Sequence, residues 1–123
     1  MSQAAAQAHA FYREVARTGK LSTVRDQRGF PQPMTNDGYR AQPFWSSLSR
    51  VQRIVKNTGA YSGCEPHEIS WLDFRERWVP GLTSDNVRVG GNWSGPRATG
   101  YDLLPQEVLR NVEYLIQELH RSQ

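Results

Sequence analysis

The chain lacks the features that mark several whole classes of protein. Its 123 residues include one cysteine, Cys64, so no disulfide can form within the chain and a reducing compartment is expected. No apolar run approaches the roughly 20 residues that cross a membrane. Residues 1–10 also lack the basic start and continuous apolar stretch of a secretory signal peptide. These absences predict a cytoplasmic protein that has no membrane partner.

Patterns of catalytic and metal-binding residues are also missing. The three histidines, His9, His67 and His120, lie far apart, and none has a second metal ligand at a known spacing. Cys64 and His67 could act as a nucleophile and its base, but one cysteine and three histidines offer such a pair by chance. We therefore predict no catalytic residues, no metal and no cofactor. An enzyme is the competing hypothesis, and it predicts a concave pocket that holds a titratable group with a shifted pKa.

Charge is distributed unevenly along the chain. Residues 1–56 carry nine basic and three acidic side chains, whereas residues 57–123 carry six basic and nine acidic ones. The basic half also contains aromatic side chains of the kind that stack on nucleic-acid bases: Tyr12, Phe30, Tyr39, Phe44 and Trp45. No known recognition motif accompanies them, so nucleic acid is an alternative partner and not the favoured one.

Helices are expected at both ends of the chain and twice between them. Ser2 can cap a first helix with apolar residues at helical spacing, and a second helix should begin at Ser46 or Ser47. Ser70 and Asp73 resemble a capping box ahead of a short helix that ends at Pro80-Gly81. The last helix, from Pro105, has the clearest apolar stripe: Val108, Leu109, Val112, Leu115, Ile116 and Leu119.

Short extended segments separate these helices. Residues 21–25, 39–44 and 68–70 are expected strands, while residues 30–34 hold two prolines and suit an edge strand or a loop. Residues 87–93 and 98–103 form the arms of an expected hairpin. We predict a single α+β domain over residues 1–123. It has an antiparallel sheet of about four to six short strands, with the N-terminal and long C-terminal helices packed on it.

Residues 90–103 hold the densest group of unusual residues, with four glycines, a proline, a tryptophan, an arginine and a tyrosine. Gly90 and Gly95 have the spacing of a phosphate-binding loop. However, Pro96 has no amide to donate, and no lysine follows. The stretch is therefore predicted to be a shaped turn between two strands.

Two of the four tryptophans, Trp45 and Trp93, are surrounded by polar and turn residues, so each could belong to the core or to a binding surface. If the hairpin turn folded over the start of the second helix, a cleft for an anionic group would form there. Its lining would be Trp45, Ser47, Arg50, Trp93, Ser94 and Arg97. In the simpler alternative, Ser47 caps its own helix and the arginines pair with Asp85 or Asp102.

Four runs of residues resemble a bacterial family known only as domain of unknown function 2750. They are residues 11–15, residues 43–47 (Pro-Phe-Trp-Ser-Ser), residues 68–82 and residues 92–103, which begin with Asn-Trp-Ser-Gly. The resemblance covers roughly residues 11–104. The first strand departs from the family pattern, because Leu21–Val24 lacks the tryptophan often found there. The resemblance implies a small cytoplasmic bacterial protein with no established activity, cofactor or catalytic residue.

The combination of aromatic and arginine side chains on turns, without a catalytic group, favours a protein-binding or regulatory module. The partner is an unidentified protein, and an immunity or accessory factor in bacteria would fit this description. Binding of nucleic acid or of a small anionic ligand is the alternative.

Overall fold

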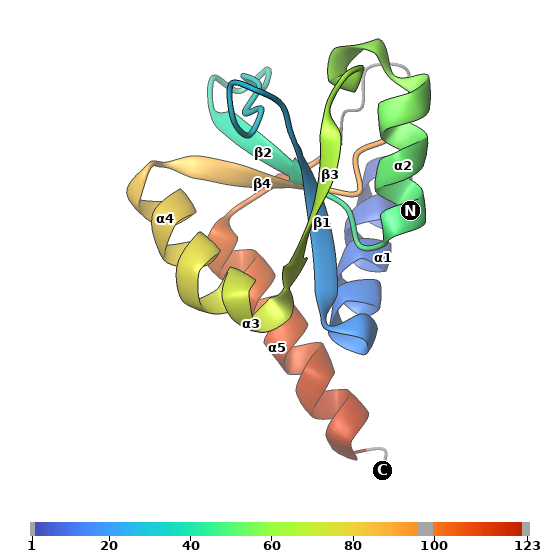
Figure 1. Cartoon of the computed structure of the whole chain (residues 1–123). Helices are drawn as coiled ribbons and strands as arrows, with labels where there is room; N and C mark the ends of the chain where they lie inside the picture. Colours follow the sequence, from blue (N-terminus) through green and yellow to red (C-terminus); the bar gives the residue numbers. More distant parts are fainter. Residues whose placement is uncertain (1, 96–99, 122–123) are drawn as a thin grey trace.

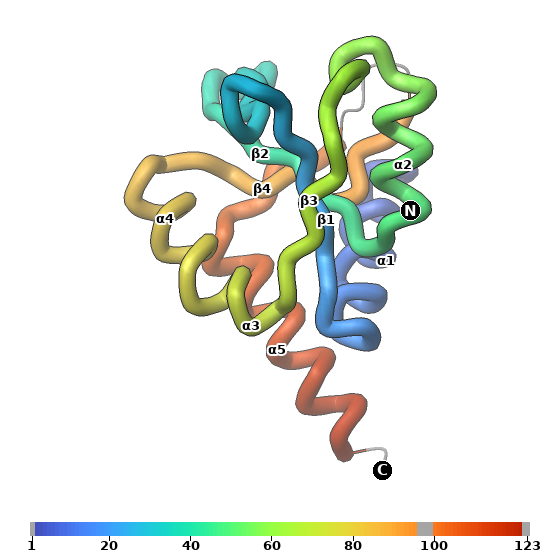
Figure 2. Tube along the Cα trace, viewed as in Figure 1, coloured from blue at the N-terminus to red at the C-terminus, as the bar shows by residue number. Residues whose placement is uncertain are grey.

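The structure, a computed structural model, describes residues 2–95 and 100–121. Helices and short strands alternate along the chain (Figures 1 and 2). The elements are α1 (Gln3–Thr18), β1 (Lys20–Arg25), β2 (Arg40–Phe44), α2 (Leu48–Asn57), the 3-10 turn η1 (Gly59–Tyr61), β3 (Glu65–Ser70), α3 (Trp71–Asp73), the π-helical stretch η2 (Phe74–Trp78), α4 (Val79–Ser84), β4 (Val87–Gly91), β5 (Asp102–Leu103) and α5 (Pro105–Arg121).

The five strands confirm the α+β class, but they form two small sheets and one strand pair is parallel. β1 and β3 pair antiparallel, from Lys20 opposite Ser70 to Arg25 opposite Glu65. In the second sheet β4 lies between β2, which is parallel to it, and β5, which is antiparallel. The chain between β2 and β4 includes α2, β3 and α4, and a crossover of this length can bring a strand back in the same direction.

The two sheets are joined by a backbone bridge between Ser22 of β1 and Trp45, which directly follows β2. The Ser22 amide donates to the Trp45 carbonyl at 2.8 Å, and the Trp45 amide donates to the Ser22 carbonyl at 2.7 Å. In Figure 1 the β1–β3 ribbon crosses the β2–β4 pair steeply at this point, with α2 beside the ribbon. Because of this crossing, the apolar residues divide into two buried clusters.

The first cluster lies where α1, α5 and α3–α4 meet the sheets, and its fully buried members include Phe11, Phe44, Phe74, Val89 and Val112. The second lies beneath α2 and contains Trp45, Val51, Tyr61 and Trp93. Both ends of the chain contribute to the first cluster, because α1 and α5 pack against each other. Beyond this contact the C-terminal end of α5 projects past the other elements (Figure 1).

The prediction that the third helix ends at Pro80-Gly81 is wrong. Ser70 caps this helix through the Asp73 amide, as expected, but the helical chain continues to Ser84. Proline lacks an amide and normally clashes with the carbonyl four residues earlier. Here the π-helical stretch from Phe74 to Trp78 widens the turn just before Pro80, which lies at the start of α4, and the helix passes through.

The predicted hairpin is confirmed where β4 and β5 pair, with Val89 opposite Leu103 and Gly90 opposite Asp102. Its arms are shorter than expected, and residues 96–99 lie outside the described residues. The glycines around it make room for Trp93. A Cβ added at Gly90 would lie 2.3 Å from Trp93 Cε2, and one at Gly100 would lie 2.6 Å from Trp93 Cδ1.

Replacing Gly90 by alanine should therefore destabilise the fold by about 1–3 kcal/mol, because the buried indole would have to move. The matched control is Gly81→Ala within α4, where an added Cβ meets nothing within 4 Å. That variant should gain about 0.5–1 kcal/mol from the lost backbone freedom of the unfolded chain. Urea denaturation measures both effects, and an unchanged midpoint for Gly90→Ala would contradict the packing described for Trp93.

Candidate functional site

Trp45 and Trp93, the two tryptophans whose location the sequence leaves open, both lie in the core. Their exposed fractions are 1% and 4%. The Trp45 indole donates to the Trp93 carbonyl at 2.8 Å, and the Trp93 indole donates to the Tyr101 carbonyl at 2.9 Å. With both rings buried and both indole N–H groups paired, neither offers a surface to a partner.

The polar neighbours of these tryptophans bind each other at the ends of the parallel strands. Ser46 follows Trp45, and Asn92 precedes Trp93. Asn92 Oδ1 accepts from the Ser46 amide at 2.9 Å, and Asn92 Nδ2 donates to the Ser46 hydroxyl at 2.9 Å. The Asn92 backbone amide donates to the Phe44 carbonyl at 2.9 Å, so one asparagine binds both the last residue of β2 and Ser46, two residues beyond it. Asn92 holds this position with a φ of 54°, which asparagine tolerates better than most residues.

Glu14 of α1 joins this group to α2. Its Oε1 accepts from the Ser46 hydroxyl at 2.7 Å, and its two oxygens accept from Arg50 Nε at 3.1 Å and Nη2 at 2.7 Å. The hydrogen bond from Arg50 lowers the pKa of Glu14, against the opposing effect of burial. Ser46, Asn92, Glu14 and Arg50 thus form a polar network that ties together α1, both parallel strands and α2.

The network changes the interpretation of the predicted anion cleft. Ser47 caps α2 by accepting from the Arg50 amide, as in the simpler alternative. Arg50 pairs with Glu14, and not with Asp85 or Asp102. Ser94 accepts a hydrogen bond from Gln7, and Arg97 lies outside the described residues. The predicted residues therefore lie near one another, but the described ones interact mainly with the protein itself.

The proposed nucleophile pair is not assembled. Cys64 is buried in the cluster beneath α2, and burial raises the pKa of its thiol, which disfavours the reactive thiolate. His67 packs its ring against Phe30 and Trp78 instead. Among residues 2–95 and 100–121, no three His, Cys, Asp or Glu side chains are grouped so that they could hold a metal ion.

An open furrow runs along the seam between α1 and α5. The hollow beside the N-terminal part of α1, called the upper hollow below, has a volume of about 430 Å³. It is lined mainly by small residues of α1, by tyrosines and by polar residues of α5. Ala5 and Ala8 do not fill the space that faces α5, which is why the seam stays hollow. The lining residues include Ala5, Ala8, His9, Tyr12, Tyr101 and Tyr114.

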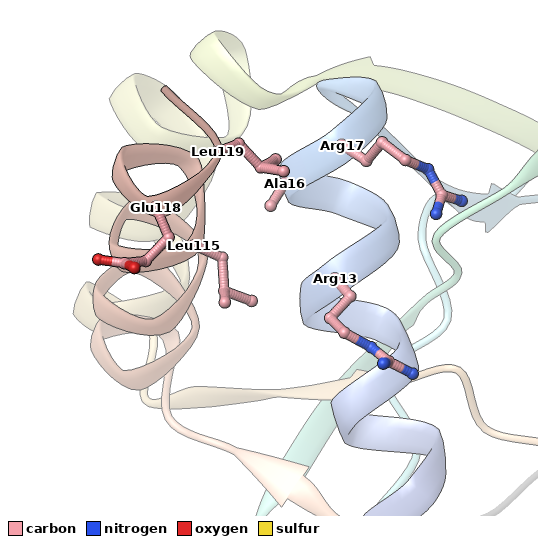
Figure 3. A pocket seen from close by; sticks show the side chains of 6 residues that line it. All are labelled: Arg13, Ala16, Arg17, Leu115, Glu118 and Leu119. Atoms are coloured by element: carbon pink, nitrogen blue, oxygen red, sulfur yellow. The ribbon is translucent and has the colours of Figure 1, made fainter. Parts of the chain in front are cut away.

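A second hollow of about 300 Å³ follows along the same seam, and Leu115 lines both. Figure 3 shows Leu119 of α5 directed toward Ala16 of α1, and Leu115 of α5 directed into the space between the two helices. The guanidinium groups of Arg13 and Arg17 extend to the side of α1 that faces away from α5 (Figure 3). The furrow therefore has an apolar floor, with the two arginines on the outer flank of α1 and Glu118 on the α5 wall.

Tyr12 lines the furrow and is half-buried there. Burial raises the pKa of its phenol, whereas a hydrogen bond with Asn111 acts in the opposite direction. The phenol is thus neutral at physiological pH and can donate a hydrogen bond inside the seam. Across the upper hollow Tyr101 and Tyr114 are 48% and 60% exposed, so aromatic surface is available to a ligand.

The furrow is not predicted by the sequence patterns described above. Most of its residues belong to the two terminal helices, whose stripes predicted burial of one face only. The alanines near the start of α1 were the available indication, because an alanine on a helix face leaves room that a larger side chain would fill. Only the packing of α1 against α5 shows which alanines face a neighbour.

Comparison with known families now identifies the chain. The family model described as a protein of unknown function (DUF2750) matches residues 8–112. The chain belongs to the DUF2750 family. This match confirms the resemblance carried by the Phe-Trp-Ser-Ser and Asn-Trp-Ser-Gly runs, which contain Ser46 and Asn92 of the polar network. No curated protein matches the sequence.

None of the helices within the described ranges combines the length and apolar character needed to cross a bilayer.

The Glu14–Arg50 pair should make this DUF2750 protein sensitive to acid. Because the folded-state pKa of Glu14 lies below its usual 4.5, the pair stabilises the fold above that pH, and the contribution is lost as the pH falls through the lowered pKa. Glu14→Gln should cost about 1–2 kcal/mol at neutral pH, a value reduced for partial exposure. Chemical denaturation of the wild type and of Glu14→Gln should show that the difference between their free energies of unfolding becomes smaller in acid.

The control for this experiment is Glu68→Gln. Glu68 forms a distant, exposed pair with Lys20, with 3.9 Å between Lys20 Nζ and Glu68 Oε1. This variant should change stability by less than about 0.5 kcal/mol. A Glu14 effect that is equally small, or that does not change with pH, would contradict the importance of the network.

Two variants can measure separately how much the backbone conformation and the side-chain hydrogen bonds of Asn92 contribute to stability. Asn92→Gly keeps the left-handed backbone but leaves the buried Ser46 amide unpaired, at a cost of about 1–3 kcal/mol. Asn92→Ala should be less stable than the glycine variant by about 1–2 kcal/mol, because a Cβ disfavours positive φ. Thermal unfolding of the two variants gives the comparison, and equal stabilities would mean that the backbone conformation does not matter.

Proposed function

We propose that this DUF2750 protein is a non-catalytic protein-binding module whose binding face is the α1–α5 furrow. The observation that supports it is an unfilled seam between two helices, edged by aromatic and arginine side chains. Tyr101, Tyr114 and Leu119 remain between 42% and 60% exposed there. Tyrosine and arginine are enriched at the energetically important centres of protein interfaces.

The structure offers less support for nucleic acid as the partner. Of the five aromatic side chains that the sequence offered for base stacking, Phe44 and Trp45 are buried. Phe30 packs edge-on against Trp78, and Arg88 covers the Tyr39 ring at 4.0 Å from its centroid. Bases need exposed aromatic faces to stack on, and these four rings are already occupied by the protein. For a small anion, the Arg50 side chain is likewise taken by Glu14.

The identity of the partner determines the biological role of the module. A toxin as partner would make the protein an immunity factor, and an enzyme as partner would make it an accessory subunit. Both roles use the same face, so the face can be tested first.

Purification of the tagged full chain from its native cells should recover one stoichiometric partner. Tyr114→Ala and Leu119→Ala should each weaken that recovery strongly, because they remove exposed side chains of the furrow. Their unfolding temperatures should stay close to that of the wild type, since truncation of exposed side chains costs about 0.5 kcal/mol or less.

The matched control is Leu72→Ala. Leu72 lies on α3, is 59% exposed and does not line the furrow. It should leave recovery of the partner unchanged. The proposal fails if a partner is retained equally by the furrow variants and by the Leu72 variant.

A further inference from the structure

From the shape and charge of the furrow we infer that its occupant is an amphipathic helix of a partner protein. This inference rests on the proposed function, and specifies the chemistry of the partner. The helix carries two apolar anchors two turns apart and acidic side chains on the flank that faces α1. Length, backbone chemistry and charge each contribute to this conclusion.

The length of the furrow matches that of a short helix. Along α1 the furrow runs from Ala5 to Ala16, and at 1.5 Å per residue this is about 17 Å, or three turns of a helix. The hollows on either side of Leu115 are centred about 10 Å apart along α1, which is the spacing of residues i and i+7 on a helix. The larger upper hollow, bordered by Tyr12 and Tyr114, suits an aromatic anchor. The lower one, bordered by Ala16 and Leu119, suits an aliphatic anchor.

The walls of the furrow offer few backbone hydrogen-bond partners. Both walls of the furrow are helices, whose interior amides and carbonyls are already bonded within the helix. Among the described residues only the two-residue strand β5 offers a strand edge near the seam. An extended segment on the apolar floor would leave most of its own amides and carbonyls unpaired, whereas a helix satisfies its backbone internally.

Positive charge lies along one flank of the furrow. Arg13 and Arg17 are exposed and lie one turn apart on the outer flank of α1, beside the furrow. Arg17 also attracts Glu14 of the same helix. Two like charges at this spacing repel each other slightly. A carboxylate of the partner placed between them would relieve that repulsion and add two attractive contacts, so the flank of the occupant that faces α1 is acidic.

The test uses the full chain and a synthetic helical peptide of about 14 residues. The peptide carries a tryptophan and a leucine seven positions apart, glutamates on one flank and glutamines on the other. A second peptide has lysines in place of the glutamates. Fluorescence anisotropy should show tighter binding of the glutamate peptide, by about tenfold, and the difference should shrink as salt is added.

Charge reversal on the protein supplies the matched control. In the variant Arg13→Glu/Arg17→Glu the preference should invert, so that the lysine peptide binds more tightly. The variant Arg25→Glu/Arg28→Glu changes charge equally at two exposed arginines outside the furrow, and should keep the original preference. NMR shifts on adding the glutamate peptide should centre on Ala8, Ala16 and Leu115.

Several results would overturn the inference. The two peptides could bind equally or not at all, or the shifts could lie elsewhere. Sedimentation could also show that a second copy of the chain occupies the furrow. If Tyr114→Ala reduces recovery of the native partner while no helical peptide binds, the proposed function stands and the helical, acidic occupant is wrong. If the furrow variants recover the native partner as well as the wild type does, the proposed function itself fails.

Discussion

The hydrogen bonds between Ser46 and Asn92 connect residues 46 positions apart, and much of the architecture depends on them. They hold together the ends of the two parallel strands, where the chain leaves each strand in a different direction. Glu14 extends the same network to α1, and Arg50 extends it to α2. The network is half-buried, and polar groups at its buried end stabilise the fold best when each has a partner. No buried side-chain nitrogen or oxygen of the described residues lacks a partner.

The position of α1 connects this network to the proposed binding face. One side of α1 carries Glu14 toward Ser46, and another carries Ala5, Ala8 and Ala16 along the seam with α5. The first side fixes the helix in place. The second leaves a furrow that the protein does not fill. In the stretch from 90 to 103, the described residues 90–95 and 100–103 serve packing instead, because Gly90 and Gly100 border the buried Trp93 ring.

Local interactions explain which sequence predictions succeeded. Ser2, Ser47 and Ser70 each cap the helix that follows, and a capping bond spans only three residues. The apolar stripe of α5 and the pairing of β4 with β5 also depend on near neighbours. The failures involve distant parts of the chain. The parallel pairing of β2 with β4 depends on a crossover of some forty residues, and helix continuation through Pro80 depends on a π-helical turn that no residue type marks.

The sequence by itself therefore determined the α+β class, the helix caps, the terminal helices and membership of the DUF2750 family. Only the tertiary structure decided whether Trp45 and Trp93 are buried, which partner Arg50 takes, and where a surface remains unfilled. The physical reason is the same in each case. Exposure and charge pairing depend on which distant segment packs against a residue, whereas propensity and periodicity depend on its neighbours along the chain.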